Sequence, residues 1–197
     1  MEENSIGQKL TFASGGPTAL FTLGFYVILL WPIATGRVDP SLAGVIVPMG
    51  IIIAVIQLIC GIIELRNGNL LGGTIPLAFS CFMAMGAGET LLKINGLMPA
   101  DSSLIDGYAM TLMGLMMAVF VPIVARAPVV VFLFYLANAC FFTPAGLGCI
   151  FNIPALVVIG NTIMIAVCPL AVWIGVAQVY EAELGRSVVW LGKPLIK

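Results

Sequence analysis

Charged residues are scarce in this chain, and histidine is absent. Only 9% of the 197 residues are Asp, Glu, Lys or Arg, against roughly 25% in an ordinary soluble domain. With 8 Lys and Arg and 9 Asp and Glu, the chain cannot build the charged surface of a soluble fold of this length. Since 61% of the residues are apolar and the mean hydropathy is +1.15, the sequence predicts a protein surrounded mainly by lipid.

The same absences exclude several classes of function. Without histidine, the chain has neither a Ser-His-Asp nor a Cys-His catalytic arrangement, and it lacks the commonest neutral metal ligand. Its five cysteines lie in apolar stretches without a CxxC pair, so we expect no metal site and no cofactor. No GxxxxGK[ST] phosphate loop occurs. A net charge of −1 without a basic cluster argues against a nucleic-acid partner. We therefore expect a protein that is not an enzyme.

Long stretches without charge alternate with short charged segments. A helix needs about 20 apolar residues to cross the hydrocarbon core of a bilayer, and Asp, Glu, Lys and Arg are absent from residues 10–36, 40–63, 67–88, 107–125 and 127–180. The last stretch is long enough for two crossings, with the turn expected at 144–148 and 152–154, which contain Pro and Gly. The sequence predicts an all-α membrane protein, a single domain over residues 1–197, with spans near 18–36, 41–64, 70–92, 104–125, 128–148 and 155–180.

The charges on the connecting segments predict the orientation of the chain. With six spans, both termini and the second and fourth connections share one side. That side carries Lys9, Arg66, Arg126, Arg186, Lys193 and Lys197, and the other carries Arg37 and Lys93. Short cytoplasmic segments are enriched in Lys and Arg, so we expect a multi-pass protein of the cell membrane with cytoplasmic termini. The first ten residues do not resemble a cleaved signal peptide, and we expect the first span to be retained.

Small residues recur at helical spacing in three of the expected spans. They form three faces: Gly107, Thr111, Gly114 and Ala118 in the fourth span, Ala84 and Gly88 in the third, and Ala171 and Gly175 in the sixth. Small residues on one face let another helix approach closely in lipid. We expect these faces to be sites of helix packing.

Neutral polar side chains occur at membrane depth, where they favour the bundle interior or a water-filled path. They are Gln57, Thr74, Ser80, Tyr135, Asn138, Asn161 and Thr162. Toward the ends of spans, Glu89 precedes Lys93 by four residues, which is the favourable order for a helical ion pair. Glu64 is either a proton-carrying group beside a path or an interfacial carboxylate bonded to helix ends. Pro17 suits the first turn of a helix, whose free N–H groups would favour an anion.

Four segments resemble, in order, the acetate uptake transporter family, which includes the succinate-acetate permease. Residues 16–20 (Gly-Pro-Thr-Ala-Leu) with Gly24-Phe25 resemble the Asn-Pro-Ala-Pro-Leu signature of the family and the Gly-Phe after it. The end of its second span resembles three parts of this chain, namely Gln57, residues 61–64 (Gly-Ile-Ile-Glu) and residues 67–69 (Asn-Gly-Asn). The spacing of Gly107 and Gly114 fits its fourth span, and residues 183–186 (Glu-Leu-Gly-Arg) resemble its tail.

The resemblance implies a homo-hexamer in which each protomer has its own path, closed near mid-membrane by large side chains. By position, this ring would be Phe25, Phe79 and Asn138, with Phe79 where Tyr is typical and Asn138 where Leu is typical. Ala171 matches a small residue associated with substrate size, and Glu64 is the matched candidate for proton coupling. The residues expected to bind the substrate are Gly16, Pro17, Thr18, Leu20, Gln57 and Thr74.

These observations favour a membrane transporter or channel for acetate and related small carboxylates, with succinate as a further substrate. The solute would move with a proton or as the bare anion. The alternative is a passive channel for a small neutral solute such as urea or a short amide, which the amide of Asn138 would suit. A structural or sensory membrane protein that transports nothing is a third hypothesis, and the polar residues at membrane depth count against it.

Overall fold

The computed structural model describes residues 12–99 and 102–196. Its helices are α1 (Gly16–Ala34), η1 (Pro40–Val45), α2 (Ile46–Arg66), α3 (Leu70–Ile94), α4 (Ser103–Val124), α5 (Val129–Ile150), α6 (Pro154–Ile163), η2 (Met164–Ala166) and α7 (Val167–Leu184), where η marks a 3₁₀ helix. Six stretches are long and apolar enough to cross a membrane, the second beginning at Ser41 and the sixth running from Pro154 to Leu184. The protein is therefore an all-α membrane protein with six spans, and each predicted span end lies within four residues of the observed one.

Glycine and asparagine set several helix ends. Gly36, Gly68 and Gly185 follow α1, α2 and α7 with φ of 66°, 80° and 63°, in the left-handed region that a residue with a Cβ avoids. Asn69 caps α3, because its side-chain oxygen accepts a hydrogen bond from the backbone N of Gly72 at 2.9 Å. The α2–α3 connection is therefore a tight turn, and it places the end of α2 beside the start of α3.

The turn between the fifth and sixth spans lies at the second of the two segments that the sequence predicts and not at the first. Residues 144–148 belong to α5, and the connection is 151–153, where Asn152 adopts a φ of 52°. Gly146 and Gly148 do not form a turn, and they allow the neighbouring helices α4 and α6 to pack closely against α5. A Cβ on Gly146 would lie 2.7 Å from the backbone oxygen of Gly107 in α4, and one on Gly148 would lie 2.7 Å from the backbone N of Val157 in α6. The packing of α5 on both neighbours outweighs the tendency of Pro and Gly to end a helix.

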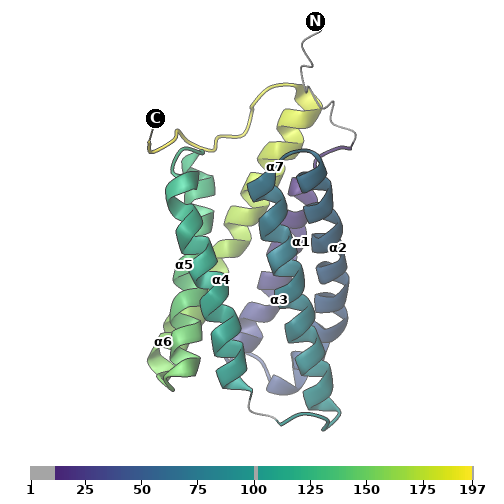
Figure 1. Ribbon diagram of the computed structural model, residues 1–197, viewed down its shortest axis with the longest axis vertical. Coiled ribbons are helices and arrows are strands. Elements are labelled where there is room, and N and C mark those ends of the chain that lie inside the picture. Colours follow the sequence, from purple (N-terminus) through teal and green to yellow (C-terminus); the bar gives the residue numbers. More distant parts are fainter. Residues whose placement is uncertain (1–11, 100–101, 197) are drawn as a thin grey trace, which may run out of the picture.

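The sixth span is broken into two helices. Pro169 lacks the N–H that would bond the carbonyl of residue 165, and its ring crowds that carbonyl. The chain passes through the 3₁₀ segment η2 at this point, as is common where a proline interrupts the helical hydrogen bonds. As a result α6 packs mainly against α5 and α7 against α1 (Figure 1).

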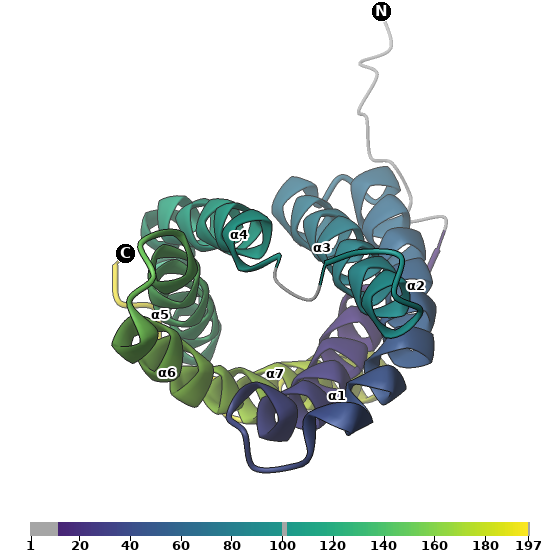
Figure 2. The same ribbon diagram turned by 90° about the horizontal axis from the view of Figure 1, so that it is seen from below.

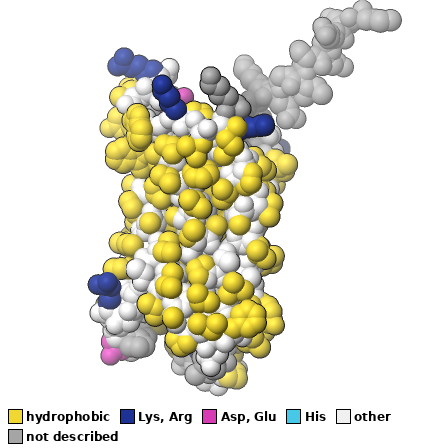
Figure 3. All heavy atoms as spheres, turned by 90° about the vertical axis from the view of Figure 1, so that its left-hand side faces the viewer, with side chains coloured by type: hydrophobic (Ala, Val, Ile, Leu, Met, Phe, Trp, Pro, Cys, Tyr) yellow, Lys and Arg dark blue, Asp and Glu magenta, His cyan; other side chains and the backbone are white. Residues whose placement is uncertain are grey.

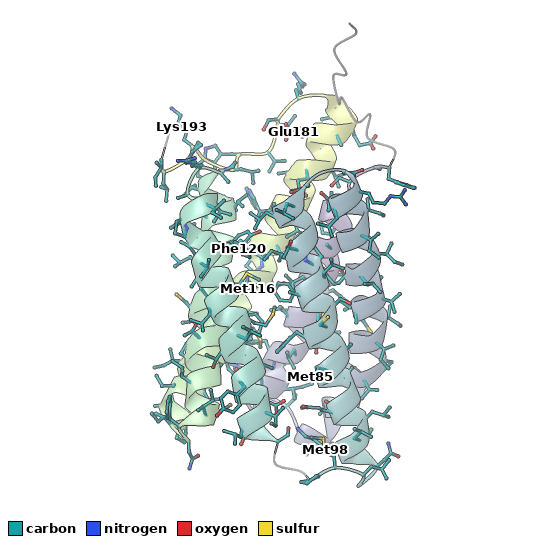
Figure 4. All side chains as sticks on the ribbon, in the orientation of Figure 1. Met85, Met98, Met116, Phe120, Glu181 and Lys193 are labelled. Atoms are coloured by element: carbon teal, nitrogen blue, oxygen red, sulfur yellow. The ribbon has the colours of Figure 1, made fainter. Side chains whose placement is uncertain are left out.

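The helices are arranged around a central axis (Figure 2). Around this axis, α4, α5, α6, α7, α1 and the α2–α3 pair follow one another, and the most extensive packing is within the α2–α3 and α4–α5 pairs. Side chains fill the middle, with Met116 and Phe120 of α4 on the side toward α3 (Figure 4). Buried Met83, Met117 and Phe142 belong to the same core.

Two of the three predicted small-residue faces pack against a neighbouring helix. A Cβ on Gly107 would lie 2.9 Å from the Cβ of Cys149 in α5, and one on Gly175 would lie 3.1 Å from the ring of Phe21 in α1. The third face behaves differently. Ala84 is exposed, and no described atom lies within 4 Å of a Cβ built on Gly88. This face of α3 therefore has no neighbour within the described chain.

The cations lie at the two ends of the helices, and apolar side chains cover the middle of the face drawn in Figure 3. We call the end where α1 begins and α7 ends the upper end, as it is drawn in Figure 1. In Figure 4, which has the same orientation, Glu181 and Lys193 lie at the upper end and Met98 lies at the lower end. By helix order, Arg66 ends α2 and Arg126 follows α4 at the upper end. Arg186 and Lys193 follow α7 at the same end. Lys9 and Lys197 lie outside the described residues.

The segment after α7 runs across the upper end to the α4–α5 connection (Figure 1). The backbone N of Val130 donates to the oxygen of Leu191 at 3.0 Å, and the N of Leu195 donates to the oxygen of Ala125 at 3.0 Å. Trp173 donates through Nε1 to the oxygen of Trp190 at 2.8 Å. These bonds satisfy backbone groups that the ends of α4 and α5 leave free.

Candidate functional site: a polar pocket above an aromatic constriction

A pocket of about 150 Å³ opens near the upper end, between the ends of α1, α2, α3, α5 and α7. Its volume is about ten times the ~10–15 Å³ that a single water requires, so it has room for a small organic solute. It is lined by Ser14, Gly16, Ala19, Leu20, Leu23, Gln57, Glu64, Asn69, Gly72, Ile75, Pro76, Phe79, Val131, Phe134, Tyr135, Ile174 and Gln178. The polar groups come mainly from the upper part, and the lower part is apolar.

Glu64 is the one acidic residue of this lining, and only 3% of it is exposed. Its Oε1 accepts hydrogen bonds from the hydroxyl of Ser14 at 2.6 Å and the backbone N of Gly16 at 3.1 Å, and its Oε2 accepts one from Nδ2 of Asn69 at 2.7 Å. Within the described ranges the ion pairs all involve Lys93. The Glu64 carboxylate is therefore held by neutral donors at the start of α1 and the cap of α3.

Gln57 lies about two helical turns below Glu64 and is also buried. Its Nε2 donates to the backbone oxygen of Ala19 at 2.8 Å and to the hydroxyl of Thr22 at 3.3 Å. These bonds tie α2 to α1 along the wall of the pocket. Gln57 thus has a structural role in addition to its polar contribution to the lining.

Below the polar pocket, a second pocket of about 20 Å³ continues toward the middle of the bundle. It is lined by Leu23, Tyr26, Val27, Leu30, Phe79, Phe82, Met83, Asn138, Phe141, Phe142 and Met164. Leu23 and Phe79 line both pockets and are 4% and 2% exposed. They form the constriction between the two pockets.

An aromatic cluster supports this constriction from one side. The ring centroid of Phe142 lies 5.9 Å from that of Phe79, 5.2 Å from that of Phe82 and 4.2 Å from that of Phe141. These separations are typical of stabilising aromatic pairs. Phe79 is therefore fixed in place by neighbours from α3 and α5, and a solute would have to displace a packed ring to pass.

Asn138 lies at the second pocket and is 1% exposed. Its Nδ2 donates to the backbone oxygen of Phe134, one turn earlier in α5, at 2.8 Å. The side-chain amide is therefore oriented by its own helix and not by a neighbouring one. It contributes a polar group to a pocket whose other side chains are apolar or aromatic.

The structure does not bring the three residues of the expected ring together. Phe79 and Asn138 both line the second pocket, but Phe25 lines neither pocket and is 51% exposed. The inward face of α1 is formed by Leu23 and Tyr26. At about 100° per residue, residue 25 points away from the face that residues 23 and 26 share.

The other expected site residues divide into two groups. Gly16, Leu20, Gln57 and Glu64 line the polar pocket, whereas Pro17, Thr18, Thr74 and Ala171 line neither pocket. Thr74 donates to the oxygen of Leu70 in its own helix at 2.8 Å. Ala171 is completely buried where α7 packs against Gly24 of α1.

Several lining residues were not expected from the sequence as site residues: Ser14, Leu23, Tyr26, Asn69, Tyr135 and Gln178. Asn69 and Tyr135 carried a signal, because Asn69 belongs to the matched 67–69 segment and Tyr135 is a polar side chain at membrane depth. Leu23 and Tyr26 could have been found only by knowing which face of α1 points inward.

A second charged cluster lies at the lower end. Lys93 pairs with Glu89 at 3.8 Å, which confirms the predicted helical ion pair, and with Asp106 of α4 at 3.7 Å. Ser102 donates to Asp106 at 2.7 Å. The cluster joins the end of α3 to the start of α4. Across the described residues, no group of three or more His, Cys, Asp or Glu could hold a metal ion.

No model of a known protein family matches the chain, and no match to a curated protein sequence is found. Among solved structures, the bacterial acetate channel SatP is similar to it over 92% of this chain and 100% of that one, with a TM-score of 0.83 and 22% sequence identity. The chain has the fold of SatP. The six-span architecture expected from the sequence is thus found in a solved membrane channel.

Within this SatP fold, the polar pocket, the constriction and the smaller pocket adjoin one another, and residues of α1, α3 and α5 line both pockets. Leu23 and Phe79 belong to both pockets, so the pockets adjoin. The polar pocket has neutral polar side chains and the buried carboxylate of Glu64, and the apolar side chains of Leu23 and Phe79 close its lower end. Such an arrangement can bind a small solute and restrict its passage.

Proposed function

We propose that this protein is a membrane channel or transporter for acetate and related small carboxylates. The observation that carries the proposal is the polar pocket that leads to the Leu23–Phe79 constriction, inside a fold shared with an acetate channel. The pocket offers hydrogen-bond donors at its upper end and apolar walls below. An amphipathic solute with a carboxyl head and a short alkyl tail matches both parts.

The test is solute flux into proteoliposomes that contain the purified protein. Labelled acetate, succinate and urea are compared side by side at the same pH and membrane potential. The proposal expects saturable acetate flux above that of empty liposomes, with succinate as a further substrate. Absence of acetate flux from correctly folded protein would reject it.

Coupling to protons is the finer part of the proposal, and Glu64 is the residue that supports it. A buried carboxylate in the pocket wall without a cationic partner in the described ranges can gain or lose a proton as the solute passes. Acetate uptake should then rise as the external pH falls and should respond to an imposed proton gradient. A flux that follows membrane potential alone would favour a bare-anion channel.

The second candidate is a channel for a small neutral solute such as urea or a short amide. Asn138 favours it, because its amide lies at a second pocket whose lining, apart from the Tyr26 hydroxyl, is otherwise apolar, and an amide can bond another amide. The flux comparison separates the two candidates: rapid urea flux with no acetate flux would favour the neutral-solute channel.

We propose, further, that the protein is a homo-oligomer, most simply a hexamer, in the cell membrane. The Ala84–Gly88 face of α3 has no described neighbour within the chain, and small residues on a lipid-facing helix favour contact with another helix. Native mass spectrometry in mild detergent should give a mass about six times 20.8 kDa. A monodisperse monomer would contradict this assembly.

A further inference from the structure

The donors at the upper end of the pocket already hold a carboxylate. Ser14, Gly16 and Asn69 together direct three hydrogen bonds onto the two oxygens of Glu64, over distances from 2.6 to 3.1 Å. Gly16 is the first residue of α1, Ser14 lies two residues before it, and Asn69 caps α3. Two segments far apart in the sequence are thus brought together around one anionic group.

This arrangement is the one that a small carboxylate solute would need. Carboxylate oxygens accept several hydrogen bonds each, and such charge-assisted bonds are among the stronger ones in proteins. The donors border the 150 Å³ pocket, so a solute in the pocket can reach them. While the ionised Glu64 side chain occupies the site, however, the three donors are already bonded. A second carboxylate would also be repelled by the like charge of Glu64.

We propose that Ser14, Gly16 and Asn69 form the carboxylate-binding site of the pocket and that Glu64 is its resident ligand. A solute carboxylate then binds in competition with Glu64, either when Glu64 is protonated or when its side chain moves out of the site. The proposal deepens the proposed function, because it names how the pocket selects a carboxylate, but the binding site can be tested without any transport.

No other ionisable group near Glu64, among the described residues, competes with it for this role. On α2, Cys60 lies one turn earlier and is buried, and Arg66 is turned outward with its guanidinium 5.7 Å from the ring of Phe12. The ionisable residues of the pocket lining are Glu64 and Tyr135. Since a thiol and a phenol are ordinarily neutral near pH 7, Glu64 is the residue of the lining that can oppose a second carboxylate by its charge.

The decisive experiment removes the resident ligand. Glu64→Ala leaves the three donors in place and opens a space beside them. We expect the purified variant at pH 7.5 to bind acetate at least tenfold more tightly than the wild-type protein, measured by calorimetry and by the shift in unfolding temperature. Formate should bind as well, whereas acetamide, which has the same shape without the charge, should not.

Two further variants identify the site. Glu64→Gln removes the like charge but still fills the space, so its acetate affinity should lie between those of the wild type and of Glu64→Ala. Adding Ser14→Ala to Glu64→Ala removes one donor and should weaken acetate binding about tenfold. Glu181→Ala, which removes an exposed carboxylate outside the pocket, is the control for a general effect of charge.

The outcomes are distinct. If Glu64→Ala is monodisperse and binds acetate no better than wild type, or binds acetamide equally well, the resident-ligand proposal is wrong. If that variant does not fold, Glu64→Gln decides: it should bind acetate more tightly than the wild type, and equal affinity of the two rejects the proposal. Enhanced binding without flux in any variant would keep the site and reject the transport function.

Discussion

Leu23 and Phe79 separate the polar pocket from the smaller pocket below it, and both side chains are almost fully buried. Phe79 is held by Phe142, whose ring centroid is 5.9 Å away. Large apolar side chains that meet across a narrow path exclude water and so oppose the passage of polar solutes. In the proposed function, these few inward-facing residues would control the passage of a solute.

Phe79→Ala should increase acetate flux. Removal of the ring opens the constriction, and a barrier lower by about 1.4 kcal/mol corresponds to a tenfold faster passage. Flux in proteoliposomes measures this, with folding checked by gel filtration because loss of a buried Phe costs about 3–5 kcal/mol of stability. Phe25→Ala is the matched control, since Phe25 is exposed and lines neither pocket. Equal flux in both variants would place the barrier elsewhere.

Asn138→Leu should change selectivity. The substitution replaces the polar group of the second pocket by an apolar one of similar size, and a desolvated polar solute that finds no partner is disfavoured by about 1–3 kcal/mol. The ratio of urea to acetate flux should therefore fall about tenfold. Asn161→Leu serves as the control, because Asn161 bonds the oxygen of Ala34 and lines neither pocket. An unchanged ratio would remove Asn138 from the path.

Close contact between α4 and α5 depends on glycines at matching heights. A Cβ on Gly146 would lie 2.5 Å from the backbone N of Thr111, and one on Gly107 would lie 2.9 Å from the oxygen of Gly146. Backbone atoms cannot move aside as a flexible side chain can. The two helices can therefore keep this separation only while these positions remain without side chains.

Gly146→Ala should destabilise the protein by about 1–3 kcal/mol, the usual cost of overpacking a close contact. Thermal unfolding in detergent measures the change. Gly86→Ala is the matched control on α3, where the Tyr26 hydroxyl lies 4.0 Å from a built Cβ, and it should leave the unfolding temperature unchanged. Equal unfolding temperatures of the Gly146 variant and the wild type would show that α4 and α5 can separate at no cost.

The whole molecule has an unequal distribution of cations between its two ends. Among the described residues, the cations at the ends of helices that finish at the upper end, or just after them, are Arg66, Arg126, Arg186 and Lys193. Those at the lower end are Arg37 and Lys93. This bias predicts that the upper end, with the polar pocket, faces the cytoplasm. The proposed carboxylate-binding site would then lie at the cytoplasmic end of the proposed path.

Labelling of single added cysteines in intact cells tests this orientation. Arg126→Cys should resist a maleimide that cannot cross the membrane until the cells are permeabilised, and Arg37→Cys should react from outside at once. Each of these changes removes one charge from an exposed position, so the pair is matched. Labelling of Arg126→Cys from outside intact cells would reverse the predicted orientation.

The sequence alone determined the number, limits and type of the spans. A stretch of about 20 residues without charge can be recognised along the chain without knowing what it contacts, and the pairing of Glu89 with Lys93 follows from their spacing on one helix. The importance of Glu64 and Gln57 was also visible, because buried polar groups within or beside spans need partners.

Only the tertiary structure decided which face of each span points inward. In a span that is apolar all round, the hydrophobic pattern does not distinguish the lipid side from the core. The sequence therefore suggested Phe25 for the inward face of α1, whereas in the structure Leu23 and Tyr26 form that face. The bonds of Ser14 and Asn69 to Glu64 join segments about 50 residues apart in the sequence. Likewise, Pro144 and the glycines after it lie within α5 because α4 and α6 pack against it. Each of these features depends on contacts between helices, which the order of residues along one helix does not specify.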